Sequence, residues 1–395
     1  SIGVDRYAQF EFLITSRGCP SRCTFCSTPE FWGARVRFRS PEHVLGELRL
    51  LQERFGHVTV SFRDDTFTAD RKRTLSLCSQ IIGSGLHLLW DCQSRANAVD
   101  EERLLWMRRA GCQHIQYGVE SGSESVLGEL NKGARVEQAV RACDRTRRVG
   151  MDLSLYLITG TRGEKARDIA ATLRLIRRVR PHDGIVSPLV AYPGTPLYQE
   201  IRRQKGLDDS IWERSRMEGL LARDDPGSVL SYRKVEAALR AVAPSSAYSL
   251  EELEEHRRRV GPFTAPLLSL GEAFEAAGDR QRAARAYEEI LSGNPSSLWG
   301  HLRLGNLAES GGDPETAASH YRSAVAAAEA RSGGAMSTEA WPSEALTTGV
   351  LCLRRGVWTR MPNSTFSKIE IGSGLGRWKT MPTVFRNSLS DTPGS

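Results

Sequence analysis

Three cysteines stand in one short window of the chain, at Cys19, Cys23 and Cys26. Three residues separate the first pair and two residues separate the second pair. Cysteine thiolates are the usual ligands of iron–sulfur clusters. Three thiolates can bind only three irons of a [4Fe–4S] cluster, so the fourth iron stays available to another ligand. The window therefore predicts a cluster with one vacant coordination position.

Two other interpretations of this window stay open. A structural zinc site takes four ligands, normally from two pairs, and the sequence shows no second cysteine pair. Three inert core thiols would be unusual in a polar loop that contains Gly18 and Pro20. The remaining cysteines stand singly and are expected to pack in cores; they are Cys78, Cys92, Cys112, Cys143 and Cys352.

The elements that must position this window follow from the alternation of apolar patterns. Strands are expected at 10–15, 58–62, 88–92, 115–119, 153–158 and 185–190. Helices are expected at 41–55, 71–82, 100–110, 123–130, 136–149, 165–178 and 197–204. Such alternation predicts a parallel sheet with right-handed crossovers. Six units are fewer than the eight of a closed barrel, so we expect an α/β partial (β/α)6 TIM-like barrel. The cysteine window follows the first strand, where sites of such folds gather.

An internal repeat with a 34-residue period occupies the later part of the chain. It is visible in the recurrence of Leu270-Gly271 at Leu304-Gly305 and of Tyr287 at Tyr321. This period is typical of tetratricopeptide repeats, so an all-α helical domain is expected after the barrel. Two copies are too few to bury a continuous core, and the preceding helical pair or the barrel is expected to supply the missing layer.

Composition limits the classes of function. The formal net charge is +7, yet the arginines are scattered over amphipathic patterns, so nucleic acid is not indicated as a partner. No apolar run is long enough to span a membrane. No signal peptide is visible, and the expected location is therefore the cytoplasm, where thiols stay reduced.

The cysteine window, with Phe25 before its last cysteine, resembles the motif of the radical SAM superfamily. The segments 62–68, 93–95, 117–124 and 192–198 resemble those that follow the later strands of that family. The set is most similar to the branch that contains cobalamin-dependent radical SAM enzymes and methylthiotransferases. The domains expected from this resemblance and the repeat are an N-terminal remnant or linker (1–8), a radical SAM partial barrel (9–222), a helical linker pair (223–263), two tetratricopeptide repeats (264–331) and a disordered tail (332–395).

The resemblance implies a mechanism. S-adenosylmethionine (SAM) would chelate the open iron of the [4Fe–4S] cluster. A one-electron reductant such as flavodoxin or ferredoxin would then drive its cleavage to methionine and a 5′-deoxyadenosyl radical. That radical would abstract hydrogen from an unknown substrate, with methylation as the leading reaction, and a protein partner would bind the repeats. The alternative is an inactive or truncated barrel that acts as a tetratricopeptide interaction protein. The intact cysteine motif argues against it.

The same resemblance assigns roles to residues in the first half of the barrel. Phe25 is expected near the cluster and the adenine, with core filling as its alternative. Asp64 and Asp65 lie where the family holds the amino group of SAM, although one of them could instead cap the following helix. Arg95 is expected to pair with the SAM carboxylate or with Glu120.

Further contacts are expected from the later strands. Glu120 and Ser121 lie where the ribose hydroxyls or the SAM carboxylate are met, and helix capping is the alternative for Ser121. Val190 and Tyr192 are expected to frame the adenine.

Two features set the chain apart from its branch. The loop after the fifth strand reads Gly-Thr-Arg-Gly-Glu at 160–164, with Arg162 in place of the usual proline. No Asp-x-His-x-x-Gly signature of a cobalamin domain is present. Because the chain starts at Ser1 without a methionine, we expect a fragment, and cobalamin would enter through a missing upstream domain.

Overall fold

The computed structural model describes residues 10–55, 59–86, 88–206 and 220–329. The expected N-terminal remnant (1–8), the expected tail (332–395) and Cys352 lie outside the described residues. Among the described helices, none is long and apolar enough to cross a membrane.

Six parallel strands form the central sheet, and they lie side by side in the order of the sequence. They are β1 (Phe10–Leu13), β4 (Thr59–Phe62), β5 (Leu89–Arg95), β6 (Cys112–Glu120), β7 (Asp152–Thr159) and β8 (Asp183–Pro188). β1 and β8 are the two edges of this sheet, so the barrel is open. The expected partial (β/α)6 barrel is confirmed.

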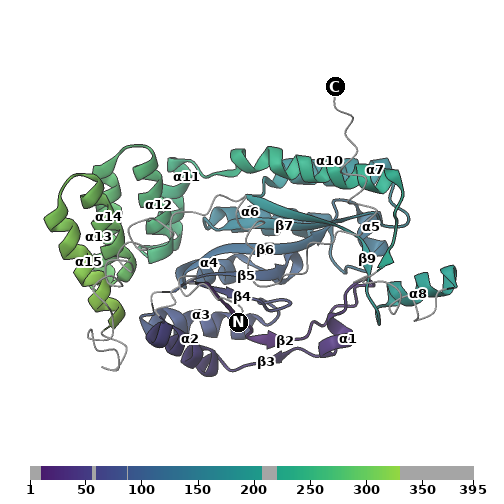
Figure 1. Ribbon diagram of the computed structural model, residues 1–395, viewed down its shortest axis with the longest axis horizontal. Helices are drawn as coiled ribbons and strands as arrows, with labels where there is room; N and C mark the ends of the chain where they lie inside the picture. The colour runs from purple at the N-terminus through teal and green to yellow at the C-terminus, as the bar shows by residue number, and fades with distance from the viewer. Residues whose placement is uncertain (1–9, 56–58, 87, 207–219, 330–395) are drawn as a thin grey trace, which may run out of the picture.

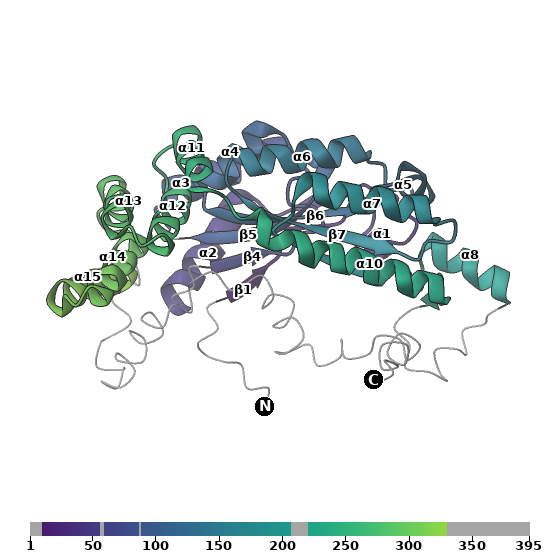
Figure 2. The same cartoon turned by 90° about the horizontal axis from the view of Figure 1, so that it is seen from above.

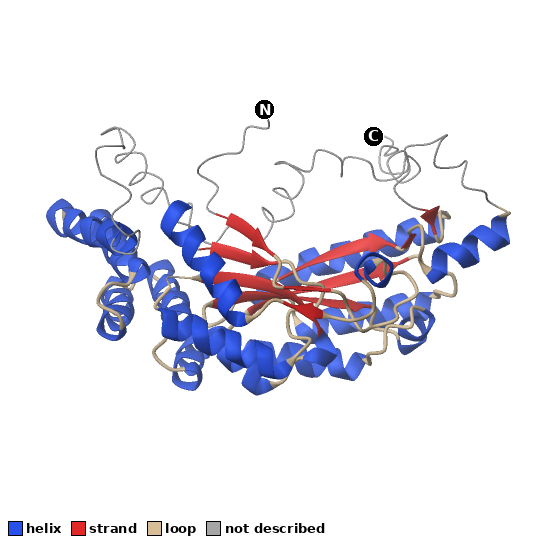
Figure 3. Cartoon of the chain, turned by 90° about the horizontal axis from the view of Figure 1, so that it is seen from below, coloured by secondary structure: helices blue, strands red, loops and turns tan. Residues whose placement is uncertain are grey.

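Helices connect the strands and gather on one side of the sheet (Figure 3). They are α2 (Pro41–Phe55), α3 (Arg71–Ser84), α4 (Glu101–Arg109), α6 (Val136–Arg148) and α7 (Ala166–Val179). Their apolar faces pack on strand residues such as Trp90, Leu153 and Leu155 in one core. α10 (Pro226–Val242) joins the same core through Val235 and Leu239, beside α7 (Figure 2). The structure thus places the first helix of the proposed linker pair against the barrel.

Short elements surround the carboxyl ends of the strands. They are β2 (Ser16–Arg17), α1 (Thr28–Trp32), β3 (Arg37–Phe38), α5 (Glu124–Glu129), β9 (Val190–Ala191), α8 (Pro196–Lys205) and β10 (Leu220–Leu221). β2 pairs with β3, and β9 pairs with β10, each antiparallel. Sequence patterns missed both pairs because strands of two residues have no periodicity to detect.

The all-helical part that follows η2 (Ala243–Ser246) lies at one end of the barrel (Figure 1). It contains α11 (Leu250–Val260), α12 (Thr264–Ala276), α13 (Arg280–Gly293), α14 (Leu298–Ser310) and α15 (Pro314–Glu329). A β-carbon placed on Gly271 would lie 2.2 Å from the Tyr287 ring, and one on Gly305 would lie 2.7 Å from the Tyr321 ring. In each helix pair, a glycine of the first helix therefore packs directly against a tyrosine ring of the second helix. The same contact recurs after 34 residues, as the sequence repeat predicts.

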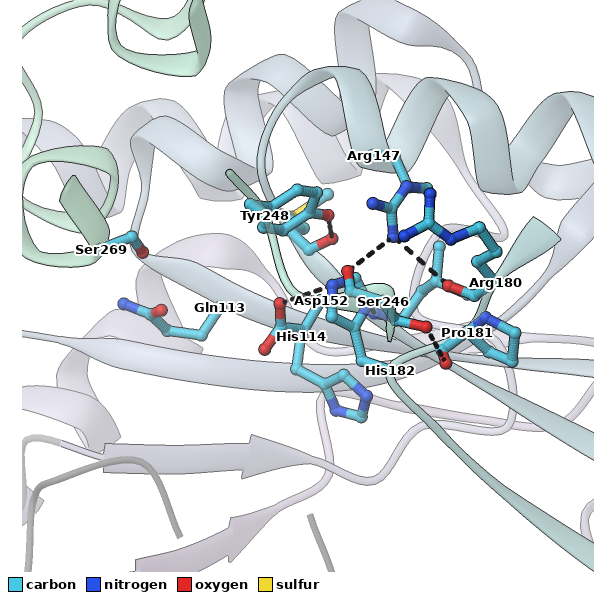
Figure 4. A network of polar contacts seen from close by, with 12 residues as sticks. Gln113, His114, Arg147, Asp152, Arg180, Pro181, His182, Ser246, Tyr248 and Ser269 are labelled. Atoms are coloured by element: carbon cyan, nitrogen blue, oxygen red, sulfur yellow. Dashed lines mark hydrogen bonds and ion pairs between the residues drawn. The ribbon is translucent and has the colours of Figure 1, made fainter. Parts of the chain in front are cut away.

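Polar side chains join the barrel to the helices that follow it, at the amino ends of β6 and β7 (Figure 4). His182 lies with Nε2 3.2 Å from Oδ1 of Asp152, and Tyr248 donates a hydrogen bond of 2.6 Å to the Met151 carbonyl. Arg147 donates to the Ser246 carbonyl at 3.1 Å. This junction lies at the end of the strands opposite to the cysteine loop.

Candidate active site

The cysteine loop lies between β2 and α1 and is attached to two distant parts of the barrel. Cys19 and Cys23 are buried and Cys26 is half-buried, and all three are free thiols. The Thr24 amide donates to the Leu130 carbonyl at 3.0 Å, and the Leu197 amide donates to the Thr24 carbonyl at 3.0 Å. The end of α5 and the start of α8 therefore hold the middle of the loop in place.

The three thiols are close enough to influence one another electrostatically. Burial is the largest cause that raises the pKa of Cys26, and the Cys23 and Cys19 thiols raise it further. A bound cation would offset the repulsion between neighbouring thiolates. This donor set fits a cluster ligand site.

The structure gives no support to the zinc interpretation. Within the described part of the chain, no group of three or more His, Cys, Asp or Glu side chains converges on one metal-ion position. A structural zinc ion needs such convergence, with four ligands around one centre. In a [4Fe–4S] cluster each thiolate binds a different iron, so the thiols need not meet at one point.

Asp64 follows β4 and is fully buried. Its carboxylate accepts hydrogen bonds from the residues at the junction of β1 and β2. Its oxygens accept hydrogen bonds from the Thr15 amide (2.6 Å) and hydroxyl (2.5 Å). They also accept from the Ser16 amide (3.1 Å) and hydroxyl (2.7 Å). With four donors already bound, Asp64 positions the chain that leads into the cysteine loop. This environment disfavours the expected contact of Asp64 with SAM.

Asp65, the neighbouring carboxylate, connects the two ends of the cysteine loop. Oδ2 accepts from the Gly18 amide at 3.2 Å, directly before Cys19, and Oδ1 accepts from the Thr28 hydroxyl at 2.8 Å, shortly after Cys26. Neither aspartate caps the next helix, because Asp70 fills that position by accepting from the Arg73 amide. The capping alternative is therefore wrong for both residues.

Arg95 lies at the end of β5 and contacts the cysteine loop. Its Nη1 lies 3.5 Å from Sγ of Cys23, its Nε lies 3.3 Å from Oδ1 of Asn97, and its Nη2 donates to the Lys132 carbonyl. Glu120 was one expected partner of Arg95, but it pairs with Lys132 instead, with Nζ and Oε1 2.5 Å apart. The structure thus places a guanidinium beside a candidate cluster ligand.

Glu120 ends β6 in an unusual backbone conformation. Its φ is +68°, in the left-handed region that non-glycine residues seldom adopt. The strand register also shifts between Gly118 and Glu120. A β-carbon on Gly118 would lie 3.0 Å from Oε1 of Glu120 and 3.1 Å from Nζ of Lys132, so a glycine leaves room for the ion pair. Strain of this kind is typical of functional sites.

Ser121 belongs to a buried polar link between the end of β6 and α7. Its hydroxyl lies 3.1 Å from that of Thr172 and accepts from the Ser123 amide at 3.1 Å. Ser123 in turn donates to Asp168 at 2.6 Å. The N-cap residue of α5 is Ser123, whose side chain makes no capping hydrogen bond, so the helix-capping alternative does not hold for Ser121.

Phe25, Val190 and Tyr192 are brought to one side of the cysteine loop. Phe25 packs against the small apolar cluster that includes Leu130, Ala191 and Leu197, so it does fill a core. Val190 pairs with Leu221 of β10, and the Tyr192 carbonyl accepts from Thr195 at the start of α8. The structure therefore groups the residues expected near the adenine.

Sequence reasoning missed two contributors to this site. Lys132 follows α5 in a loop, and nothing in its sequence surroundings shows that it is buried beside Glu120. Thr66 lies with Oγ1 3.9 Å from Sγ of Cys19, and only its position two residues after Asp64 could have suggested it. The unusual Arg162 finds a partner in Glu200 of α8, 2.6 Å away.

Comparison with known proteins identifies the domains. Residues 13–176 match the model of the radical SAM superfamily, and residues 267–297 match the model of the tetratricopeptide repeat. The chain therefore carries a radical SAM domain followed by tetratricopeptide repeats, as the sequence resemblance indicated. A [4Fe–4S] cluster and SAM are the cofactors of this superfamily, in agreement with the cofactors expected from the cysteine motif.

Curated relatives are similar to this chain over about half of its length. An uncharacterized methyltransferase of Pyrococcus horikoshii is 32% identical over 190 residues, which are 48% of this chain and 41% of the relative. The bacteriochlorophyllide d C-12(1)-methyltransferase of Chlorobaculum tepidum is 28% identical over 201 residues, which are 50% of this chain and 44% of that protein. The anaerobic magnesium-protoporphyrin IX monomethyl ester cyclase of Rubrivivax gelatinosus is 29% identical over 188 residues, which are 47% and 34% of the two chains. The chain thus spans less than half the length of these relatives.

Proposed function

We propose that the chain is the radical SAM part of a methyltransferase-like enzyme, with Cys19, Cys23 and Cys26 as the three protein ligands of a [4Fe–4S] cluster. The observation that carries this proposal is the set of three free thiols on one loop, fixed at the carboxyl ends of the strands. When bound, the cluster would supply the electron that splits SAM into methionine and a 5′-deoxyadenosyl radical.

The residues of the chain would prepare the site in three ways. Asp65 would keep the ends of the cysteine loop together through Gly18 and Thr28. Arg95 would hold a positive charge beside Cys23, with its Nη1 3.5 Å from Sγ. Phe25 and the surrounding apolar cluster would exclude water from one side of the loop.

The contacts with SAM remain predictions of the sequence resemblance. Asp65 is the better candidate for the amino group, since Asp64 already accepts four hydrogen bonds. Glu120 would contact the ribose hydroxyls. Ser121 would hold the turn after Glu120 in place through its contacts with Thr172 and Ser123. Val190 and Tyr192 would lie beside the adenine.

Methyl transfer is favoured over other uses of the radical, because two of the relatives that are similar to this chain are named methyltransferases. Cobalamin would take part through a domain outside this chain, and adding hydroxocobalamin to the assays tests that part of the proposal. We further propose that the protein lies in the cytoplasm and that a flavodoxin- or ferredoxin-like protein is its reductant.

Anaerobic reconstitution with iron and sulfide tests the proposal directly. The wild-type chain should take up about four irons and, with SAM and dithionite, release 5′-deoxyadenosine. A variant with alanine at Cys19, Cys23 and Cys26 should do neither, whereas Cys143→Ala, on the buried face of α6, should do both. A wild-type chain that binds no iron would contradict the proposal and favour the inactive-barrel alternative.

A further inference from the structure

A group of exposed arginines lies beside the cysteine loop. Arg17, Arg35 and Arg37 belong to the β2–β3 hairpin and its approach, and Arg22 belongs to the loop itself. The segment 12–40 contains five arginines but a single carboxylate, Glu30. We call the four exposed arginines, together with Phe31, the loop-side patch.

The positive charges of this patch are held together without neutralisation. Arg17 and Arg37 are directly opposite each other in the antiparallel pair, an arrangement in which like charges repel. Among the residues that the structure describes, no ion pair involves any of the four arginines, whereas Arg39, the fifth, pairs with Glu47. The patch therefore keeps a positive field that is available to a partner.

The patch adjoins the candidate cluster ligands directly. Arg17 and Arg22 flank Cys19 in the sequence, and a β-carbon on Gly18 would lie 2.6 Å from the Arg35 carbonyl. Asp65, the carboxylate at the ends of the loop, already accepts from Gly18 and Thr28. It therefore contributes to the loop rather than to an ion pair with the outer arginines.

An exposed aromatic side chain completes the patch. Phe31 on α1 is 79% exposed, and its ring lies 5.6 Å from that of Trp32 in an edge contact. The Arg17 guanidinium lies over the Trp32 ring at 5.2 Å. Arginine and aromatic residues are enriched in protein interfaces, and redox encounters use small ones. In Figure 1, α1 and the hairpin lie away from the repeat helices, so the repeats leave this surface clear.

We propose that the loop-side patch docks an acidic protein that donates one electron to the cluster; this inference rests on the proposed function. The donor would lose one electron and the cluster would gain it, with no proton or group transferred. A small positive patch beside the cysteine loop suits such a donor, because charge steers the encounter and Arg22 belongs to the loop that would hold the cluster. An RNA partner would need a longer basic track along its backbone.

The test compares rates of cluster reduction in reconstituted holoprotein. Reduced flavodoxin, an acidic donor, is mixed anaerobically with wild type, Arg35→Glu/Arg37→Glu, and the charge-matched control Arg174→Glu/Arg177→Glu on α7. The hairpin variant should be reduced about tenfold more slowly at low salt, because steering accelerates association by 10-fold or more. The control should equal wild type, and Arg35→Lys/Arg37→Lys should keep the fast rate. High salt should bring all rates together.

Dithionite reduction separates this inference from the proposed function. If dithionite reduces the cluster equally in all variants, the substitutions have left the cluster site intact. Any difference in the flavodoxin rate then comes from docking alone. Equal flavodoxin rates in the hairpin variant and wild type would then overturn the docking surface. A hairpin variant that loses affinity for single-stranded RNA but keeps its flavodoxin rate would overturn it as well. Failure of wild type to hold a cluster would overturn the proposed function instead.

Discussion

Glu120 combines a left-handed backbone, a buried carboxylate and a buried cationic partner. The side chains of Lys132 and Glu120 are only 6% and 9% exposed. Two charges removed from water are tolerated when each compensates the other, and they become costly when one is lost. The pair therefore fixes the end of β6 next to the cysteine loop, and its effect can be measured by removing one partner.

Lys132→Ala should lower the free energy of unfolding by about 3–5 kcal/mol, because the Glu120 carboxylate would stay buried without its partner. Urea denaturation of the two proteins measures the difference. The double variant Glu120→Gln/Lys132→Met, which buries no charge, should lose less than Lys132→Ala alone. Equal losses would contradict the assignment of the pair.

Two histidines, the half-buried His114 and the buried His256, should make stability depend on pH. Burial is the largest cause that lowers the pKa of His114 and His256, each to about 4, from an ordinary value near 6.5. Between pH 6.5 and pH 4 the unfolded chain binds protons that the folded chain does not, so each histidine makes stability fall as the pH falls. The stabilisation from their neutral forms is complete only above about pH 6.5.

His256→Gln should therefore flatten this pH dependence by up to about 1.4 kcal/mol per pH unit. Urea midpoints between pH 4 and pH 7 measure the slope for wild type and variant. His43→Gln, at an exposed position on α2, is the matched control and should leave the slope unchanged. A wild-type slope in His256→Gln would show that this histidine titrates normally.

Elements differ in how far their sequence reveals them. The expected strand 153–158 appears as Asp152–Thr159, because a run of buried apolar residues flanked by helical patterns is characteristic of a parallel sheet. The β2–β3 hairpin was missed, since it depends on tertiary contacts such as that of Asp65 with Gly18. The candidate cluster ligands share one loop, so their spacing in the sequence was enough to propose them. The Glu120–Lys132 pair was not, because two residues twelve positions apart meet only through the turn after α5.

The repeat helices provide a test of close packing. Gly271→Ala should destabilise the protein by about 1–3 kcal/mol, because the new methyl group would lie 2.2 Å from the Tyr287 ring. Gly46→Ala is the matched control: that glycine lies within α2 with no atom near its β-carbon position, and alanine should stabilise the helix by up to about 1 kcal/mol. Thermal unfolding compares the two. A Gly271→Ala protein as stable as wild type would contradict the packing.

At the scale of the whole molecule, the barrel and the repeats form one connected unit. Arg108 of α4 is 1% exposed and donates to the Cys112 carbonyl at 3.0 Å within the barrel. It also donates to the Ala265 carbonyl at 3.2 Å and to the Ser269 hydroxyl at 2.8 Å on α12. One buried guanidinium thus binds acceptor groups of both parts and links α12 to the barrel.

Arg108→Ala should loosen this junction, because each buried acceptor left without a donor costs about 1–3 kcal/mol. Hydrogen exchange should then accelerate in α12 and in the first strand residues of β6. Arg285→Ala, exposed on α13, should leave these amides unchanged. Unaltered protection of α12 in Arg108→Ala would show that other contacts suffice to hold the repeats.

The two backbone hydrogen bonds of Thr24 also have a consequence for biosynthesis. The loop that carries the thiols is fastened by Leu130 and Leu197, which leave the ribosome long after it. At about 5–20 residues per second, the nascent loop waits on the order of ten seconds or longer for its last anchor. We therefore expect the cluster to be inserted only after translation has passed α8, and the thiols to need protection from oxygen until then.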